Sequence, residues 1–384
     1  MKWTSRERVI AAINHVEADR VPINVIPLHD FYLNLKAYLG IEVGEEVKAS
    51  LSMEVVPHPE VLKRLGVDLI RVKMSVPKKG TGHFLPEGHA EDEWGVIYRR
   101  VSQSGGGSYY EIAKSPLADA TLNDLKNYPW PDPNQPGVGE AVEKNAKRLY
   151  EDTDLALMGR FGGPIIEMPI YLMGMQNWMM RAVTEPEFAA ALLDKITDVQ
   201  IAYDRIGLEA SAKYLQIFRA SGEDLGTQNS TLYSPKMFKE LILPRLKRRW
   251  QADREILDRI NPAVKIMLHS CGGIRPFIAD MIAGGIQVLD PVQPKAKGMD
   301  SFELKKEFGQ QLSFHGGVDI QDVLPFGTQA EVEEEVKTRL KAFGPGGGYI
   351  LAPAHTVQAD VPPANIVAMC AAAQKYGQYP LNII

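Results

Sequence analysis

The chain has 384 residues, of which 45% are hydrophobic and 24% charged, and its formal net charge is -5 at pH 7. This length suffices for two average domains or one large α/β barrel. The acidic balance argues against a nucleic-acid-binding protein, which needs a basic face, and no run approaches the roughly 18 apolar residues that cross a bilayer. Two cysteines cannot form a disulfide framework, and the N-terminal residues lack the apolar core of a signal peptide. We therefore expect a cytoplasmic protein that binds neither nucleic acid nor membranes.

Apolar runs and helical periods alternate along most of the chain. A short helix over residues 5–15 precedes a first strand at residues 23–26, and a helical pattern interrupted by prolines covers residues 31–65. Seven further strands are expected at residues 68–73, 155–159, 214–218, 265–269, 286–289, 311–314 and 349–352. The main helices between them are expected at residues 139–150, 186–211, 328–343 and 363–376, and another begins at Ser234-Pro235.

Residues 77–134 interrupt this alternation. The helical period disappears there, and two aromatic-rich segments, residues 94–101 and 109–112, predict a hairpin across Gly105-Gly106-Gly107. We interpret the stretch as an insertion, because its strands carry aromatic side chains that need a surface to pack on. The expected organisation is one barrel domain over residues 1–384 with an insertion at about 77–134.

Eight strands with helices between them is the count for a (β/α)8 barrel of the TIM type, although a doubly wound sheet has a similar pattern. The position of the polar residues favours the barrel, because its strand ends converge on one mouth where catalytic groups lie. The polar residues just past expected strand ends are His29, Asp30, Arg160, Glu223, Asp224, His269, Cys271, Asp290, Gln293, His315, Asp319 and His355.

The segment His269-Ser270-Cys271 carries the strongest chemical signal. In an extended chain residues i and i+2 point to the same side, so an imidazole and a thiol face one volume. A purely structural pair is the alternative. The other cysteine, Cys370, lies in an apolar helical run where a buried inert thiol is the ordinary interpretation. A barrel brings His355 to the same rim, so it can complete a metal site with His269 and Cys271.

Several motifs together resemble the uroporphyrinogen decarboxylase superfamily, and most closely its branch of corrinoid- and zinc-dependent methyltransferases. The resemblance rests on Leu268-His269-Ser270-Cys271-Gly272, Phe314-His315-Gly316-Gly317-Val318-Asp319, Glu223-Asp224-Leu225-Gly226-Thr227-Gln228, Ser234-Pro235 and Pro362-Pro363-Ala364-Asn365-Ile366. It covers nearly the whole chain and implies a modified (β/α)8 barrel.

The chain departs from the superfamily at two places. Decarboxylases carry an Arg-Gln-Ala-Gly-Arg-Tyr segment after the first strand, whereas residues 27–32 here read Pro-Leu-His-Asp-Phe-Tyr. Without those guanidinium groups the substrate carboxylates lose bidentate partners. The methyltransferases have His-x-Cys and a later Cys as zinc ligands, and the later position here is His355. Histidine is also a good zinc ligand, so the resemblance implies zinc bound by His269, Cys271 and His355.

One thiolate and two imidazoles leave a zinc site with a formal charge of plus one, which makes the ion a better Lewis acid than a neutral site. Such a site suits a methyl-ether donor, because demethylation of an aryl ether expels a phenolate. We therefore expect an O-demethylase that passes the methyl group of a small methoxylated aromatic substrate to a corrinoid (cobalamin) on a partner protein. No Asp-x-His-x-x-Gly cobalamin signature occurs in this sequence.

The expected catalytic side chains are Glu223, Asp224 and His315, where Glu223 or Asp224 supplies a fourth ligand or a proton. The expected substrate-binding side chains are His29, Phe31, Tyr32, Arg160 and Gln293. Three other hypotheses remain open: a methylcobamide:thiol methyltransferase of the coenzyme M type, a lyase of the uroporphyrinogen decarboxylase type, and a barrel that only binds a ligand.

Overall fold

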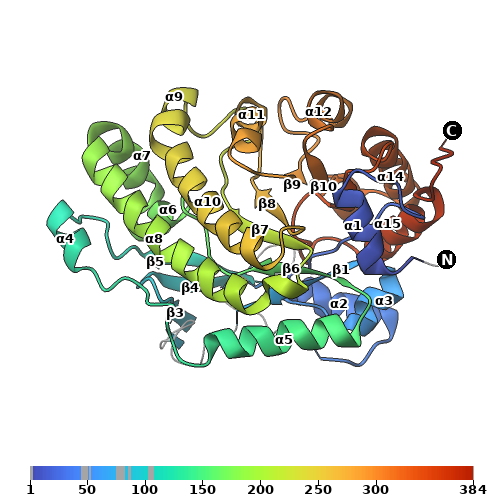
Figure 1. Cartoon of the computed structure of the whole chain (residues 1–384), viewed down its shortest axis with the longest axis horizontal. Coiled ribbons are helices and arrows are strands. Elements are labelled where there is room, and N and C mark those ends of the chain that lie inside the picture. The colour runs from blue at the N-terminus through green and yellow to red at the C-terminus, as the bar shows by residue number, and fades with distance from the viewer. Residues whose placement is uncertain are drawn as a thin grey trace.

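The computed structural model describes residues 3–44, 51, 53–74, 83–84, 88–102 and 108–383 of the chain. Its centre is a curled, parallel sheet with helices packed around it (Figure 1). In both chain order and sheet order the strands are β1 (Leu69–Lys73), β6 (Ala156–Arg160), β7 (Ile217–Gly222), β8 (Lys265–His269), β9 (Val288–Val292), β10 (Ser313–Val318) and β11 (Tyr349–Pro353). The predicted fold class, an α/β barrel of the TIM type, is confirmed. Because all seven strands run in parallel, their C-terminal ends meet at one end of the sheet.

The first expected strand, residues 23–26, is not a regular strand. Ile23 forms only an isolated parallel bridge with Leu351 of β11. The Asn24 N–H nevertheless donates to the Leu351 carbonyl at 2.9 Å, and the Asp68 N–H donates to the Ile23 carbonyl at 2.8 Å. The segment therefore lies between β11 and β1. Pro22 and Pro27 flank it and have no N–H to donate, so a continuous ladder cannot form.

Helices surround the sheet, and most of the expected ones are present. They are α1 (Ser5–Ile13), α2 (His29–Leu39), α3 (Pro59–Leu65), α4 (Leu122–Asn127), α5 (Val138–Asp152), α6 (Met168–Met173), α7 (Met175–Thr184), α8 (Pro186–Ser211), η2 (Ala212–Tyr214), α9 (Pro235–Met237), η3 (Phe238–Ile242), α10 (Leu243–Ile260), α11 (Arg275–Ala283), α12 (Ser301–Phe308), α13 (Val323–Phe326), α14 (Gln329–Phe343) and α15 (Pro363–Tyr376). The capping box predicted at Thr328 and Glu331 opens α14. None of the described helices is long and apolar enough to cross a membrane.

Four expected segments have wrong boundaries. The helical pattern over residues 31–65 divides into α2 and α3, because Gly40 ends α2 in the left-handed conformation and Pro59 starts α3. Strand β7 begins at Ile217, since the residues before it form the short helix η2. Strands β9 and β10 are longer at their C-terminal ends than expected, so Asp290 and His315 lie inside strands.

A second sheet is inserted between β1 and β6. It is antiparallel, with β2 (His83–Phe84), β3 (His89–Glu91), β4 (Ile97–Ser102) and β5 (Ser108–Lys114) in that order. The expected hairpin corresponds to β4 and β5, while Gly105-Gly106-Gly107 and residues 77–82 lie outside the described residues. The backbone N–H of Ser108 donates to Asp30 Oδ2 at 3.1 Å, which ties the hairpin to α2. The single-domain organisation with an insertion at 77–134 stays a prediction.

The sheet interior is filled by apolar side chains from six strands. Leu69, Ala156, Met158, Ile217, Met267, Val288 and Ile350 are all buried there. Val9 and Ile13 of α1 join the same cluster and cover its N-terminal end. Only the opposite end, where the strands finish, is left for polar side chains.

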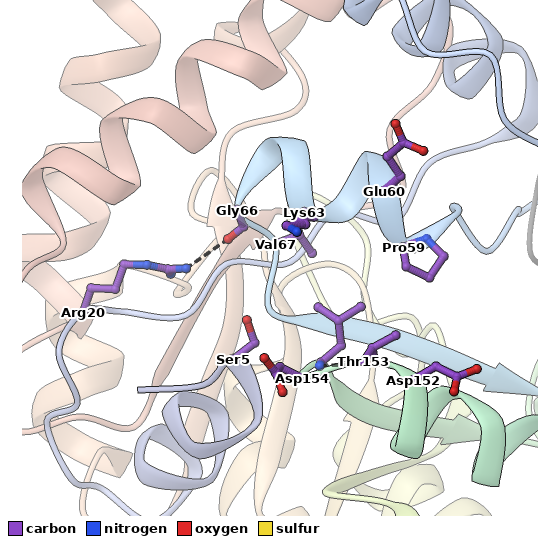
Figure 2. A pocket seen from close by; sticks show the side chains of 11 residues that line it. Ser5, Arg20, Pro59, Glu60, Lys63, Gly66, Val67, Asp152, Thr153 and Asp154 are labelled. Carbon is purple, nitrogen blue, oxygen red and sulfur yellow. Dashed lines mark hydrogen bonds between the residues drawn. The ribbon is translucent and has the colours of Figure 1, made fainter. Parts of the chain in front are cut away.

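A cavity of about 490 Å³ lies beside the N-terminal ends of β1 and β6 (Figure 2). Arg20, on its wall, donates to the Gly66 carbonyl at 3.0 Å and forms an ion pair with Asp68 at 2.8 Å. Its other charged side chains, Glu60, Lys63, Asp152 and Asp154, are exposed to solvent. Polar groups at this end of a barrel are typical of stability rather than catalysis.

Candidate metal centre

Three side chains at the C-terminal end of the sheet meet as the sequence predicts. His269 is the last residue of β8, Cys271 follows two residues later, and His355 follows β11. One donor atom from each lies within 4.8 Å of the other two. Cys271 Sγ is 3.5 Å from His269 Nε2, and the two imidazole rings are 5.8 Å apart. Two imidazoles and one sulfur at this spacing fit zinc, which prefers nitrogen and sulfur ligands in a tetrahedral arrangement.

Glycine and glutamine residues shape the loop that carries Cys271. Gly272 has φ of 86°, and a Cβ there would approach the Gly226 backbone to 2.3 Å, so no other residue fits. The Gly272 N–H donates to Gln293 Oε1 at 2.6 Å. Gln293, expected to bind substrate, holds this loop. It does not line the cavity beside His269 and His355.

Asp290 orients His269 from behind. Its Oδ2 lies 2.7 Å from His269 Nδ1 and 3.1 Å from a terminal nitrogen of Arg219, while its Oδ1 lies 2.6 Å from His315 Nδ1. The bond to Nδ1 leaves His269 Nε2 facing Cys271, which is how a carboxylate fixes a metal-binding histidine. Burial alone would raise the pKa of Asp290, but Arg219, His315 and His269 hold it well below its ordinary value. Asp290 is therefore ionised in the folded protein.

Protonation differs between His269, at the end of β8, and Cys271, which follows that strand. Burial, followed by the charge of Arg219, lowers the pKa of His269, so its imidazole is neutral near pH 7 as a metal ligand requires. Burial, followed by the Asp224 carboxylate, raises the pKa of the Cys271 thiol far above its ordinary value. A thiolate at this position needs a cation beside it, which a bound metal provides.

Two of the three donor residues, His269 and His355, line a cavity of about 430 Å³. His269, His355 and Gly222 form part of its wall, and a Cβ on Gly222 would come within 3.3 Å of the His269 ring. Tyr109 of the inserted sheet and Tyr171 of α6 also line it. The cavity therefore combines metal-binding donors with two aromatic rings, within the size range of small-molecule sites.

One side of the cavity is acidic. Glu167 and Asp224 both line it, and Glu167 accepts hydrogen bonds from the Asp224 N–H and the Tyr171 hydroxyl, each at 3.0 Å. Burial, then the carboxylates of Asp224 and Glu223, raise the pKa of Glu167 to about 8. Glu167 is therefore mostly protonated at neutral pH and able to donate a proton.

Another side is basic. Arg160 and Arg219 line the cavity, and Glu54 beside them forms ion pairs with Arg71 at 2.5 Å, with Arg160 at 3.3 Å and with Lys73 at 4.0 Å. Three cations thus share one carboxylate. Arg160 is the expected substrate-binding residue that the structure does place in the cavity wall.

The structure corrects other expected site residues. Glu223 is completely buried and outside the cavity wall, and its carboxylate oxygens accept the backbone N–H groups of Ile165 and Ile166 at 2.8 and 2.7 Å. Its carboxylate holds the backbone after β6 in place. Phe31 and Tyr32 are fully buried in the core on α2, because their helix packs this face inward.

His29 and His315 also lie away from the main cavity wall. His29 is partly exposed at the start of α2 and lies 3.2 Å from the Asp30 carboxylate. His315 is buried behind Asp290, and its other ring nitrogen is 2.9 Å from Asn24 Nδ2. It shares Asp290 with His269, and it lines a small neighbouring pocket together with His269 and His355.

Sequence reasoning missed Glu54, Arg71, Lys73, Glu167, Tyr171 and Arg219. A signal existed for the basic residues, since Arg71 and Lys73 stand two apart in an apolar strand and Arg219 interrupts another. Charged residues inside buried strands are rare without a partner. Glu54 and Glu167 lie outside strands and carried no comparable signal.

An α/β barrel whose polar cavity opens at the C-terminal ends of its strands has the architecture of an enzyme. Residues 105–376 match the family model described as "Uroporphyrinogen decarboxylase (URO-D)". The chain belongs to this family and is an enzyme of the URO-D superfamily.

Curated relatives and a solved structure agree with this assignment. The chain is 25% identical over 282 residues to uroporphyrinogen decarboxylase of Proteus mirabilis (strain HI4320), covering 71% of this chain and 73% of that protein. It is 26% identical over 278 residues to that of Yersinia pestis (strain Pestoides F), covering 68% and 71%. A solved "methyltransferase from Methanosarcina mazei" is 20% identical, with a TM-score of 0.63 and coverage of 98% and 99%. That likeness shows a shared fold.

Proposed function

We propose that the protein is a zinc-dependent methyltransferase that moves a methyl group from an aryl methyl ether to the reduced corrinoid of a partner protein. The observation that carries the proposal is the meeting of His269, Cys271 and His355, two of which, His269 and His355, line the cavity. Zinc, when bound, supplies a Lewis acid for the ether oxygen. The donor set leaves that ion with a formal charge of plus one.

The chain's own residues account for the remaining requirements. His269, Cys271 and His355 hold the ion, and Asp290 keeps the His269 ring in the binding orientation. As the bond between methyl carbon and oxygen breaks, its electron pair stays on oxygen, and the methyl group goes to the corrinoid. Glu167 holds a proton in the same cavity and donates it to the departing oxygen.

The zinc content of the purified protein tests whether His269, Cys271 and His355 bind a metal. Purified wild-type protein is compared by mass spectrometry with Cys271→Ala, His355→Ala and the control Cys370→Ala, which removes the other buried thiol on α15. We expect about one zinc per chain in the wild type and the control, and a large loss in the other two variants, because three protein ligands suffice to hold a catalytic zinc with an open fourth position. Wild-type protein without zinc would overturn the proposal.

The decarboxylase hypothesis is the second candidate, since the curated relatives carry that name and basic side chains line the cavity. Against it, a tetracarboxylate needs several guanidinium partners, and residues 27–32 contain none. Only Arg160 and Arg219 reach the cavity wall among the described residues. Decarboxylation of uroporphyrinogen by metal-free protein would favour this candidate. Rapid methyl transfer from a methylated corrinoid to coenzyme M, without ether cleavage, would favour the thiol methyltransferase.

A further inference from the structure

The buried Arg219 side chain has more N–H donors than hydrogen-bond partners. Its side chain is 4% exposed, and one terminal nitrogen pairs with Asp290 at 3.1 Å. Its Nε and its other terminal nitrogen have no hydrogen-bond partner among the described residues. A buried, unsatisfied guanidinium N–H is costly and rare in native proteins. Arg219 also lines the cavity, so a molecule bound there could supply the missing acceptors.

Near Arg219, three further cationic side chains share one carboxylate, while Glu167 and Asp224 line another side of the cavity. Arg160 lines the same cavity, and Glu54 is its carboxylate partner. Glu54 is also shared with Arg71 and Lys73. Burial, followed by the charge of Arg71, lowers the pKa of Lys73 to about 7. Lys73 therefore loses its proton more easily than an ordinary lysine, because burial and the neighbouring cations disfavour its charged form. An anion bound near Arg160 and Arg219 would offset the repulsion among these cations.

We propose that Arg160 and Arg219 form an anion subsite that binds a carboxylate on the methyl donor. This inference rests on the proposed function, and it narrows the substrate to methoxylated aromatic carboxylates. A carboxylate matches the forked geometry of a guanidinium and accepts two N–H groups at once. His269, His355 and the rings of Tyr109 and Tyr171 line the same cavity as the two arginines, so one substrate can contact all three features.

Two ligands that differ in charge test whether the subsite recognises an anion. Isothermal titration calorimetry measures benzoate and benzamide, which share size and ring but differ in charge, on wild type and three variants. Arg160→Gln removes one guanidinium, and Arg219→Lys keeps the charge but loses the fork. Arg99→Gln, exposed on β4, is the control. Circular dichroism and zinc content are recorded on the same samples.

We expect wild type to bind benzoate at least about tenfold more tightly than benzamide, the scale of one charge-assisted hydrogen bond. Arg160→Gln and Arg219→Lys should lose about tenfold for benzoate and little for benzamide, while Arg99→Gln keeps the preference. Equal binding of the two ligands by wild type would overturn the subsite and assign the free Arg219 nitrogens to water. That result, with zinc retained, would leave the proposed function standing. Benzoate preference in protein that binds no zinc would overturn the metal centre and not the subsite.

Discussion

Replacing Asp290 by asparagine tests how the metal centre is held without removing any of its three donors. The substitution keeps the shape of the side chain but removes its charge. Asp290 Oδ2 faces His269 and Arg219, and its Oδ1 faces His315. An asparagine amide has one acceptor oxygen and one donor nitrogen, so it cannot accept on both sides. Either His269 or His315 then faces a donor.

The structure gives two separate magnitudes for this change. Loss of the carboxylate that orients a metal-binding histidine lowers metal affinity by about 10–100-fold, or about 1.4–2.8 kcal/mol. Removing one partner of a buried ion pair, here the partner of Arg219, costs about 3–5 kcal/mol of stability.

The second cost depends on pH. The pKa of Asp290 is below its unfolded value, so its contribution is present above about pH 4 and is lost as pH falls further. The stability difference between wild type and variant should therefore shrink in acid.

A chelator competition titration measures zinc affinity, and urea denaturation measures the free energy of unfolding. The matched control is Asp68→Asn, because Asp68 is also fully buried and pairs with Arg8 at 2.7 Å and Arg20 at 2.8 Å before β1, at the other end of the sheet. Asp68→Asn should lose stability and keep wild-type zinc affinity. Wild-type zinc affinity in Asp290→Asn would refute the reasoning, whatever happens to its stability.

Three further predictions concern the cavity. His355→Cys should retain zinc but cleave the ether more slowly, because a second thiolate neutralises the site; unchanged turnover would contradict the charge argument. The rate of ether cleavage should decline above about pH 8, because Glu167 loses its proton there. Glu167→Gln should be slower by about 100-fold or more and should lack that decline. A stopped-flow pH profile that still falls in the variant would exclude Glu167 as the proton donor. Benzoate binding at pH 8 should take up protons, because a nearby anion raises the pKa of Lys73 from about 7 and favours its charged form. Calorimetry in buffers of different ionisation enthalpy measures this uptake, which should vanish in Lys73→Met.

Much of the fold followed from local patterns. Buried parallel strands form short apolar runs, and each of the seven regular strands was found near its predicted position. The metal-binding pair was visible because His269 and Cys271 are two residues apart in an extended segment, so one dihedral pattern places both. The prediction that His355 lies near this pair required only that β8 and β11 end at the same mouth of the barrel.

The errors arose where packing decides the direction of a side chain. Phe31 and Tyr32 follow an extended segment, but a helix begins at His29 and turns both rings into the core. Glu223 and Asp224 are neighbours in sequence, yet only Asp224 faces the cavity, while Glu223 turns away to bind backbone N–H groups. Sequence spacing cannot separate two adjacent carboxylates without knowing which of them the chain needs for its own hydrogen bonds.

The two halves of the barrel contribute different chemistry to the cavity. The proposed metal ligands come from β8 and the segment after β11, whereas the basic side chains come from β1, β6 and β7 with Glu54 between them. Asp290 touches both groups, since one of its oxygens contacts His269 and Arg219 together. A carboxylate bound at the unpaired nitrogens of Arg219 therefore shares a guanidinium with Asp290, which orients His269. Substrate binding and zinc affinity should then be coupled, and by linkage the effect must be equal in both directions.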